Sequence, residues 1–209
     1  MQKYTNDISV AGNVSIRQLT AADWSLCRQI RLEALTLEAS KFGPKLETEK
    51  NYSDDFWRHW LGANDRAVFG LFDGTKMIGM TGVLTWTPAI LEIQVGKEWG
   101  KRVGDQTAMC ASSYIQSHYR GKGHAYLFHL AATHWAGSQP KFSRLLAPYR
   151  ASNKIARGLR LSRGFQEIDR HPFDWPDGVR EDVVISMLDL KIWRQTITLN
   201  SQTLNAINK

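Results

Sequence analysis

The sequence contains few cysteines and no long apolar run. Its 209 residues include only Cys27 and Cys110, which is too few for a disulfide framework and typical of a reducing compartment. No stretch approaches the roughly 20 apolar residues of a membrane span. The polar start MQKYTNDISV lacks the apolar segment of a secretory signal. The sequence therefore predicts a cytoplasmic protein with no membrane association.

The residue patterns of several common sites are also missing. The six histidines show no metal-ligand spacing, and no Ser-His-Asp or Cys-His set has a supporting context. No helix-turn-helix, zinc finger or stacking-aromatic motif indicates a nucleic-acid-binding module. We therefore expect that the protein requires no metal.

The composition is that of a globular protein with an excess of positive charge. Hydrophobic residues make up 43% and charged residues 22% of the chain, and a chain of this length is most simply one domain. Lysine and arginine number 27 against 20 acidic residues, a net charge of +7. This excess favours an anionic partner, which could be a nucleic acid, a phosphate-bearing cofactor or an acidic surface.

Hydrophobic periodicity predicts the order β-α-α-β-β-β-α-β-α-β-β. The strands are expected at 14–20, 67–72, 76–86, 108–116, 143–149, 165–173 and 182–190. This order indicates one α/β domain, a mixed central sheet of about seven strands flanked by about four helices. We expect the domain at 14–190, after an N-terminal extension (1–13) and before a loose, polar C-terminal tail (191–209). Residues 87–105 show no clear pattern.

The stretch SHYRGKGHAYLF, residues 117–128, joins a predicted strand to a predicted helix through a turn with two glycines. Such a turn presents unpaired N–H groups and the positive end of a helix dipole, which together bind anions. A Walker loop is excluded because Gln116 and Gly123 stand where that motif needs a glycine and a serine or threonine. A dinucleotide fingerprint fails because Tyr126 occupies its last glycine position. We expect the turn to bind a phosphate group.

The turn fits R-x-x-G-x-A, and farther along NKIARGLRLSRGF carries Asn153, Ala156 and Gly164-Phe165. These residues resemble the two signatures of the GCN5-related N-acetyltransferase (GNAT) superfamily, [RQ]-x-x-G-x-[GA] and N-x-x-A-x-x-x-Y-x-x-x-G-F. The predicted element order is also similar to that of the family. The resemblance covers roughly residues 14–190 and implies a GNAT-like fold, with acetyl-CoA as co-substrate.

The resemblance implies which residues bind acetyl-CoA. Tyr114 and Ile115 would pair their backbone with the pantetheine arm, and Asn153 would contact the cofactor, cap a helix, or do both. Lys154 and Arg157 could add positive charge around the phosphates, or form a solvated surface. The pyrophosphate would be wrapped by the turn residues Arg120, Gly121, Lys122, Gly123, His124 and Ala125.

The catalytic residues are less well indicated. Arg160 stands where the family usually has a tyrosine general acid, and a guanidinium cannot donate a proton at neutral pH. Arg160 would therefore stabilise the departing thiolate or face solvent, with protonation from water or from Tyr149. The oxyanion would meet a backbone N–H within about 113–115. Three carboxylates in the stretch without clear pattern could supply the base or be surface charges: Glu92, Glu98 and Asp105.

The acceptor is expected to be a primary amine of a small molecule or a peptide. The resemblance implies that its pocket is shaped by Phe42-Gly43, by the aromatic helix with Phe56, Trp57 and Trp60, and by the segment 86–99. Aromatic side chains suit an amphipathic or cationic amine. The net charge keeps two alternatives open, a toxin-type acetyltransferase acting on aminoacyl-tRNA and a nucleic-acid-binding module without catalysis. The sequence does not indicate an oligomeric state.

Overall fold

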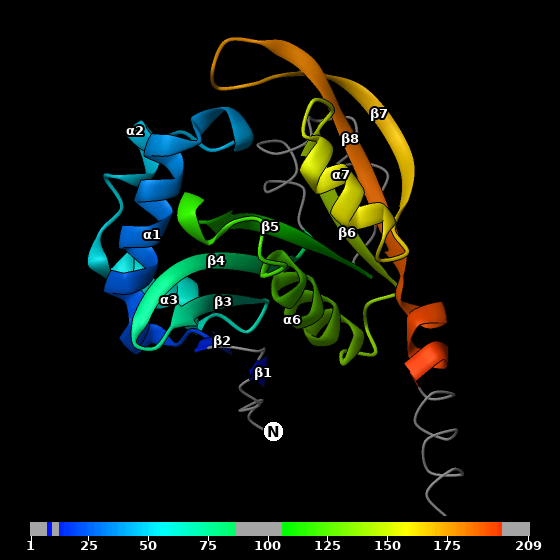
Figure 1. The fold of residues 1–209 in the computed structure, drawn as a ribbon, viewed down its shortest axis with the longest axis horizontal. Helices are drawn as coiled ribbons and strands as arrows, with labels where there is room; N and C mark the ends of the chain where they lie inside the picture. The colour runs from blue at the N-terminus through cyan, green and yellow to red at the C-terminus, as the bar shows by residue number, and fades with distance from the viewer. Residues whose placement is uncertain (1–7, 10–12, 87–105, 198–209) are drawn as a thin grey trace, which may run out of the picture.

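The computed structural model describes residues 8–9, 13–86 and 106–197, which form one mixed sheet with helices on its faces (Figure 1). Within these residues the strand order is β1-β2-β3-β4-β5-β6-β8-β7. All neighbours are antiparallel except β5 and β6. The predicted α/β architecture is confirmed. The strands are β1 Ile8–Ser9, β2 Val14–Gln18, β3 Arg66–Asp73, β4 Lys76–Thr85, β5 Thr107–Ile115, β6 Arg144–Arg150, β7 Gln166–Asp174 and β8 Arg180–Asp189.

The helices pack on both faces of the sheet, which alternate along β3 as a period of two requires. Val68 and Phe72 contribute to a core cluster with α1 and α3, whereas Phe69 and Leu71 belong to a cluster with α6. A third cluster surrounds Trp175 beside β6 and β8. The α-helices are α1 Trp24–Leu37, α2 Leu46–Glu49, α3 Asp54–Gly62, α6 Ala125–Gly137 and α7 Lys154–Leu161, and short 3-10 turns are η1 Ala21–Asp23, η2 Ala39–Lys41 and η3 Ser117–Tyr119.

Local capping and turn signals in the sequence have the predicted consequences. The Ser53 side chain accepts a hydrogen bond from the N–H of Phe56 and caps α3. Asn153 caps α7 in the same way, through the N–H of Ala156. The Asp-Gly-Thr turn joins β3 and β4 as a hairpin, with Gly74 at φ 56°. Each signal acts within a few residues, so the fold need not be known to predict it.

Strands β5 and β6 separate after a short contact, as Figure 1 shows. Their parallel pairing consists of Thr107 with Arg144, Ala108 with Leu145, and Met109 with Leu146. Beyond Met109, β5 continues to pair with β4 on one side only, while β6 continues to pair with β8. The second half of β5 therefore has an open edge toward β6, and this opening positions the site described below.

The start of the C-terminal tail differs from the loose extension that we expected. Residues 190–197 are helical, and Trp193 packs against the core on the α6 side. A Cβ at Gly137 would lie 2.1 Å from the Trp193 ring, so this contact needs a glycine in α6. Arg194 donates hydrogen bonds to the carbonyls of Gly137 and Phe142. The domain limits at 14 and 190 stay predictions.

The structure adds one observation about membranes. Among the residues that it describes, no helix is both long enough and apolar enough to span a bilayer.

Candidate active site

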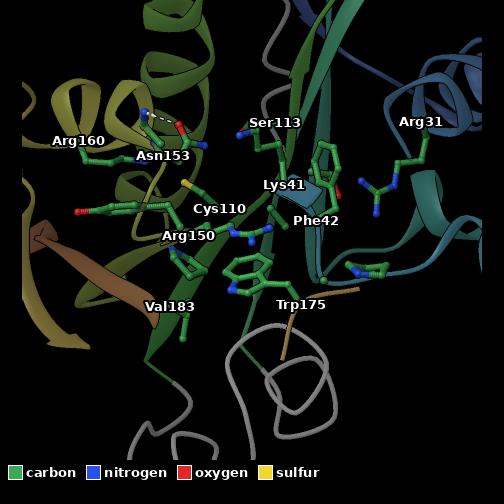
Figure 2. Close-up of a pocket in the computed structure, with 17 residues that line it drawn as sticks. Arg31, Lys41, Phe42, Cys110, Ser113, Arg150, Asn153, Arg160, Trp175 and Val183 are labelled. Atoms are coloured by element: carbon green, nitrogen blue, oxygen red, sulfur yellow. Dashed lines mark hydrogen bonds between the residues drawn. The ribbon is translucent and has the colours of Figure 1, made fainter. Parts of the chain in front are cut away.

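A cavity of about 150 Å³ lies where β5 and β6 separate (Figure 2). We call it the splay cavity. Residues 110–113 of β5 line it from one side, and Tyr149, Asn153 and Arg160 line it from β6 and α7. Arg31 of α1 and the loop 41–44 close it from the opposite side. Segments far apart in the sequence therefore meet at the open edge of one strand.

Strand β5 carries a bulge at the splay cavity. Its register with β4 shifts between Met80 and Gly82, and Ser112 has a φ of 58°. A left-handed conformation is costly for a residue with a side chain and is concentrated at functional sites. The hydroxyl of the next residue, Ser113, lies 2.8 Å from that of Thr81 on β4. The bulge leaves backbone groups of β5 out of the ladder at Ser112 and Ser113, two residues that line the cavity.

The glycine turn after η3 contains a row of backbone donors that have no hydrogen-bond partner among the described residues. Gly121 and Gly123 have φ of 75° and 80°, and a Cβ at either position would meet no atom within 4 Å. Within the described residues, the N–H groups of 121–125 make no hydrogen bond, and the next two N–H groups bond back to Gly123 and His124. Because α6 begins at Ala125, its positive dipole end adds to these donors. The geometry is that of an anion site.

The basic side chains around the turn differ in their partners, and Lys122 Nζ lies 5.5 Å from the centre of the Tyr119 ring. Arg120 donates to the carbonyl of Ile115 at 2.7 Å and to Glu38 at 2.7 Å, so its guanidinium braces the turn against β5 and the end of α1. Arg157 is similarly paired with Glu167. Lys122 and Lys154 are exposed. Two of the four cations expected around the phosphates are therefore already engaged by carboxylates.

The other predicted cofactor residues lie along the same path. Tyr114 and Ile115 pair with β4, through Met80 and Gly79. The Tyr114 hydroxyl points to the α1 side, where it donates to Glu33, and burial raises the pKa of Tyr114 to about 12. Asn153 lines the splay cavity while it caps α7. The turn, the open half of β5 and Asn153 thus form one continuous line from the anion site to the cavity.

Arg160 lines the splay cavity and is half-buried. In Figure 2 its side chain extends from α7 toward Asn153, above Cys110. Its Nε is buried without a hydrogen-bond partner, and no ion pair with a described carboxylate neutralises its charge. Part of the side chain is therefore buried, and its guanidinium lies 5.5 Å from the centre of the Phe165 ring. The choice between the two expected roles of Arg160 stays a prediction. The pKa of His129 is lowered to about 4, mainly by burial and also by the positive charge of Arg160.

Tyr149 also lines the splay cavity, but its proton is engaged. The hydroxyl donates to Glu167 at 2.6 Å, and burial together with this hydrogen bond raises the pKa of Tyr149 to about 12. Glu167 also accepts from Arg157. To protonate a leaving group in the cavity, Tyr149 would have to break its bond to Glu167.

Two buried arginines at the site were not identified from the sequence. Arg150 is 7% exposed and pairs with Asp177 and Glu181, and it donates to the carbonyl of Ser40. It thereby ties the loop after α1 to the β7–β8 turn over the splay cavity. Arg31 forms a two-hydrogen-bond pair with Glu49, at 2.8 and 2.6 Å. Each partner is distant in the sequence, so no local pattern could have indicated these pairs.

A second cavity of about 410 Å³ adjoins the first. We call it the aromatic cavity, because Tyr52, Phe56, Trp57 and Trp60 line it together with Met80 and Leu84. Arg31, Gly43, Pro44, Ala111 and Ser112 line both cavities. The predicted acceptor residues are therefore gathered here with two exceptions: Phe42 lines the splay cavity, and Trp86 is buried in the cluster around Trp175. The segment 87–99 lies outside the described residues.

The remaining predictions from the sequence concern the catalytic base, a metal and the two cysteines. Glu92, Glu98 and Asp105 lie outside the described residues. In the described ranges, no three His, Cys, Asp or Glu side chains gather as a metal site would require, and the expectation that no metal is needed stays a prediction. Both cysteines are free and buried. Cys110 lines the splay cavity, and burial raises the pKa of its thiol.

Comparison with known proteins identifies a family. A sequence profile described as "Acetyltransferase (GNAT) family" matches residues 29–165. A search of curated proteins finds no significant match.

Solved structures show the same fold at low sequence identity. The ribosomal-protein-S5-alanine acetyltransferase from Vibrio fischeri has a TM-score of 0.69 and 14% identity, over 90% of this chain and 98% of the other. An acetyltransferase of the GNAT family from Streptococcus pneumoniae has 0.68 and 16%, over 84% and 98%. YncA from Salmonella typhimurium, solved with its cofactor acetyl-CoA, has 0.66 and 17%, over 86% and 95%.

Proposed function

Because the chain belongs to the GNAT family of acetyltransferases, we propose that it is an acetyl-CoA-dependent N-acetyltransferase that acts on a primary amine. The observation that carries this proposal is the row of free N–H groups at 121–125, which leads along the open half of β5 into the splay cavity. A phosphate at one end and a thioester at the other would fit one extended cofactor. The two free, buried cysteines support a reducing compartment such as the cytoplasm.

Each part of this path has a role in the proposed reaction. The N–H groups of 121–125 bind the pyrophosphate, and the edge of β5 that is open toward β6 beyond Met109 hydrogen-bonds the pantetheine arm as an added strand. Asn153 contacts the cofactor from α7 while capping that helix. Ser112 and the residues after it supply a backbone N–H to the oxyanion, because the bulge frees these groups from the ladder.

The chemical step requires a neutral amine and a stabilised leaving group. The amine nitrogen attacks the thioester carbonyl, the C–N bond forms, and the C–S bond breaks as the nitrogen loses its proton. Arg160 stabilises the departing thiolate as a fixed positive charge, and the thiolate takes its proton from water. Tyr149 is the alternative acid, but its bond to Glu167 disfavours that role.

The acceptor class is open at this level. The neighbour from Vibrio fischeri acts, by its name, on the alanine of ribosomal protein S5. RimL, with a TM-score of 0.64, is named a ribosomal L7/L12 alpha-N-protein acetyltransferase and was solved with coenzyme A. Identities of 14% and 12% support the fold, so both a peptide amine and a small-molecule amine are candidates.

The test is thiol release on incubation with acetyl-CoA and a panel of amines. We expect acetyl-CoA alone to raise the melting temperature, since a ligand that binds only the native state stabilises it by mass action. Dephospho-CoA should stabilise less if Lys154 or its neighbours contact the 3′-phosphate. A salt-sensitive tRNA mobility shift without turnover of small amines would instead favour an aminoacyl-tRNA acceptor. Absence of both a thermal shift and thiol release would refute the proposal.

A further inference from the structure

The aromatic cavity has the size and lining of a specific small-molecule pocket. Its volume of about 410 Å³ lies within the range of about 300–1,000 Å³ that is usual for ligand sites. Phe56 and Trp60 stack on one wall, with ring centroids 6.0 Å apart, and Trp57 meets Phe56 edge to face. An apolar group of aromatic size would therefore be bound there by burial.

The junction between the two cavities contains a buried arginine, and one lysine lines each cavity. Arg31 lines both cavities and is 4% exposed. Its Nε and Nη2 donate to Glu49, but Nη1 is buried and has no hydrogen-bond partner in the part of the chain that the structure describes. Lys41 lines the splay cavity and Lys45 the aromatic cavity. Among the described lining residues, Glu49 is the one acid, and Arg31 already neutralises it. An anionic oxygen would satisfy the free donor and balance the charge.

A cationic body would gain little in the aromatic cavity. The Arg66 guanidinium lies 4.0 Å from the centre of the Trp60 ring. A cation of the chain therefore already uses one face of this ring. A second positive charge in the cavity would also be repelled by Lys45. A polyamine or another dication is therefore a poor fit.

Given the acetyl transfer proposed above, on which this inference rests, we infer that the acceptor is a free α-amino acid with a large aromatic side chain. Ser112, at the bulge, and Arg31 both line the junction. An α-amino acid carries its amine and its carboxylate on one carbon. It can therefore place the amine at the bulge, the carboxylate at Nη1 of Arg31 and the ring in the aromatic cavity. The products are an N-acetylated amino acid, coenzyme A and one proton.

The first experiment compares kcat/KM for tryptophan, tryptamine, tryptophanamide and alanine by thiol release. We expect tryptophan to exceed tryptamine and tryptophanamide by roughly 10- to 100-fold, the factor for one charge-assisted hydrogen bond. Alanine should be poorer still, because it leaves the aromatic cavity unfilled. Equal values for tryptophan and its amide would overturn the inference in favour of a peptide amine. A preference for tryptamine or alanine would overturn it as well.

The second experiment removes the charge at the junction without leaving a buried carboxylate alone. The double variant Arg31→Met with Glu49→Leu replaces the ion pair by apolar side chains, a change that buried pairs often tolerate. We expect it to fold and to lose the preference for tryptophan over tryptophanamide. The matched control, Asp55→Leu with Arg58→Met, removes an exposed pair on α3 and should keep that preference. A folded junction variant with unchanged preference would contradict the assignment.

Calorimetric titration of tryptophan into the CoA-bound protein separates this inference from the proposed reaction. Tryptophan binding that is tighter than tryptamine binding, without any thiol release, would support the cavity assignment and refute acetyl transfer. Efficient acetylation of alanine and tryptamine, with no tryptophan preference, would support transfer and refute the assignment. Absence of tryptophan binding in the titration would refute the assignment in either case.

Discussion

The two sides of strand β5 present different kinds of atoms to their proposed ligands. On the cofactor side, the donors are backbone N–H groups of the turn at 121–125 and of the open half of the strand. On the acceptor side, the surface consists of side chains from α1, α2 and α3, with the Arg31–Glu49 pair at its centre. A site made of backbone leaves glycines in a fixed local pattern. A site made of side chains leaves no pattern when its members are distant in sequence.

The largest expected effect tests the side-chain character of the acceptor side. Arg31→Ala leaves the Glu49 carboxylate buried without a partner and should lower the free energy of unfolding by about 3–5 kcal/mol. Urea denaturation measures the change. The control Arg58→Ala breaks an exposed pair with Asp55 and should cost less than about 1 kcal/mol. If Arg31→Ala lowered the free energy of unfolding by less than about 1 kcal/mol, the Arg31–Glu49 pair would not stabilise the acceptor side.

The next effect tests the backbone character of the cofactor side. Gly123→Val adds a β-branched side chain at φ 80°, beside the free N–H groups, and should weaken CoA binding by about 100-fold, or about 3 kcal/mol. Calorimetric titration with CoA checks this. Gly178→Val is the matched control, since Gly178 has φ 81° and no neighbour within 4 Å in the β7–β8 turn. Near wild-type affinity in a folded Gly123→Val protein would remove the proposed anion site.

The cofactor side also contains one buried histidine, which gives it a pH dependence. His129 on α6 packs against Phe165, and its pKa is lowered from 6.5 to about 4 by burial and by Arg160. Below pH 6.5 the unfolded chain takes up this proton and the folded chain does not. The stability that His129 confers is therefore present above pH 6.5 and lost as the pH falls toward 4.

The expected loss is about 2–3 kcal/mol over this interval. Thermal or urea unfolding as a function of pH measures it. His129→Leu should flatten the profile between pH 6.5 and 4, while the contribution of Asp23, whose pKa is lowered to about 2 mainly by Arg17, acts below that interval. An unchanged slope in the variant would show that His129 is not the group that titrates.

A smaller effect is expected at Arg160, whose side chain adds a charge to the cofactor side, where the other donors are backbone groups. Arg160→Ala should lower kcat at saturating acetyl-CoA by about 10- to 100-fold, because the thiolate loses its fixed positive charge. Arg160→Lys should recover part of the loss. Arg163, which lies over the Tyr126 ring at 3.9 Å, supplies the control Arg163→Ala. Unchanged turnover in both Arg160 variants would assign this residue no catalytic role.

The smallest effect is expected at Tyr149. Tyr149→Phe removes the hydrogen bond to Glu167 and should lower stability by about 1 kcal/mol, with kcat within about threefold of wild type, because the hydroxyl proton is already donated. Steady-state kinetics beside an unfolding curve separates the two readouts. A drop in kcat of about tenfold or more at unchanged stability would make Tyr149 the acid.

Much of the fold was predictable because its signals are local. Period-two runs gave the strands, Ser53 and Asn153 gave helix starts, and the Asp-Gly turn gave the β3–β4 hairpin. The tail after Leu190 was not predictable in the same way. Its polar composition suggested a loose extension, but Trp193 finds a contact at Gly137 that exists only after α6 has packed.

The sequence by itself indicated the proposed anion site, since Gly121 and Gly123 permit the turn at positive φ and the following helix supplies the dipole. It also determined that position 160 holds a permanent cation. Only the tertiary structure decided that this cation points into the cavity, that Arg150 joins the loop after α1 to the β7–β8 turn, and that Arg31 leaves one donor at the junction. The physical reason is the distance along the chain over which each interaction acts. Backbone conformation follows from neighbouring residues, whereas side-chain pairing depends on which distant segments the sheet brings together.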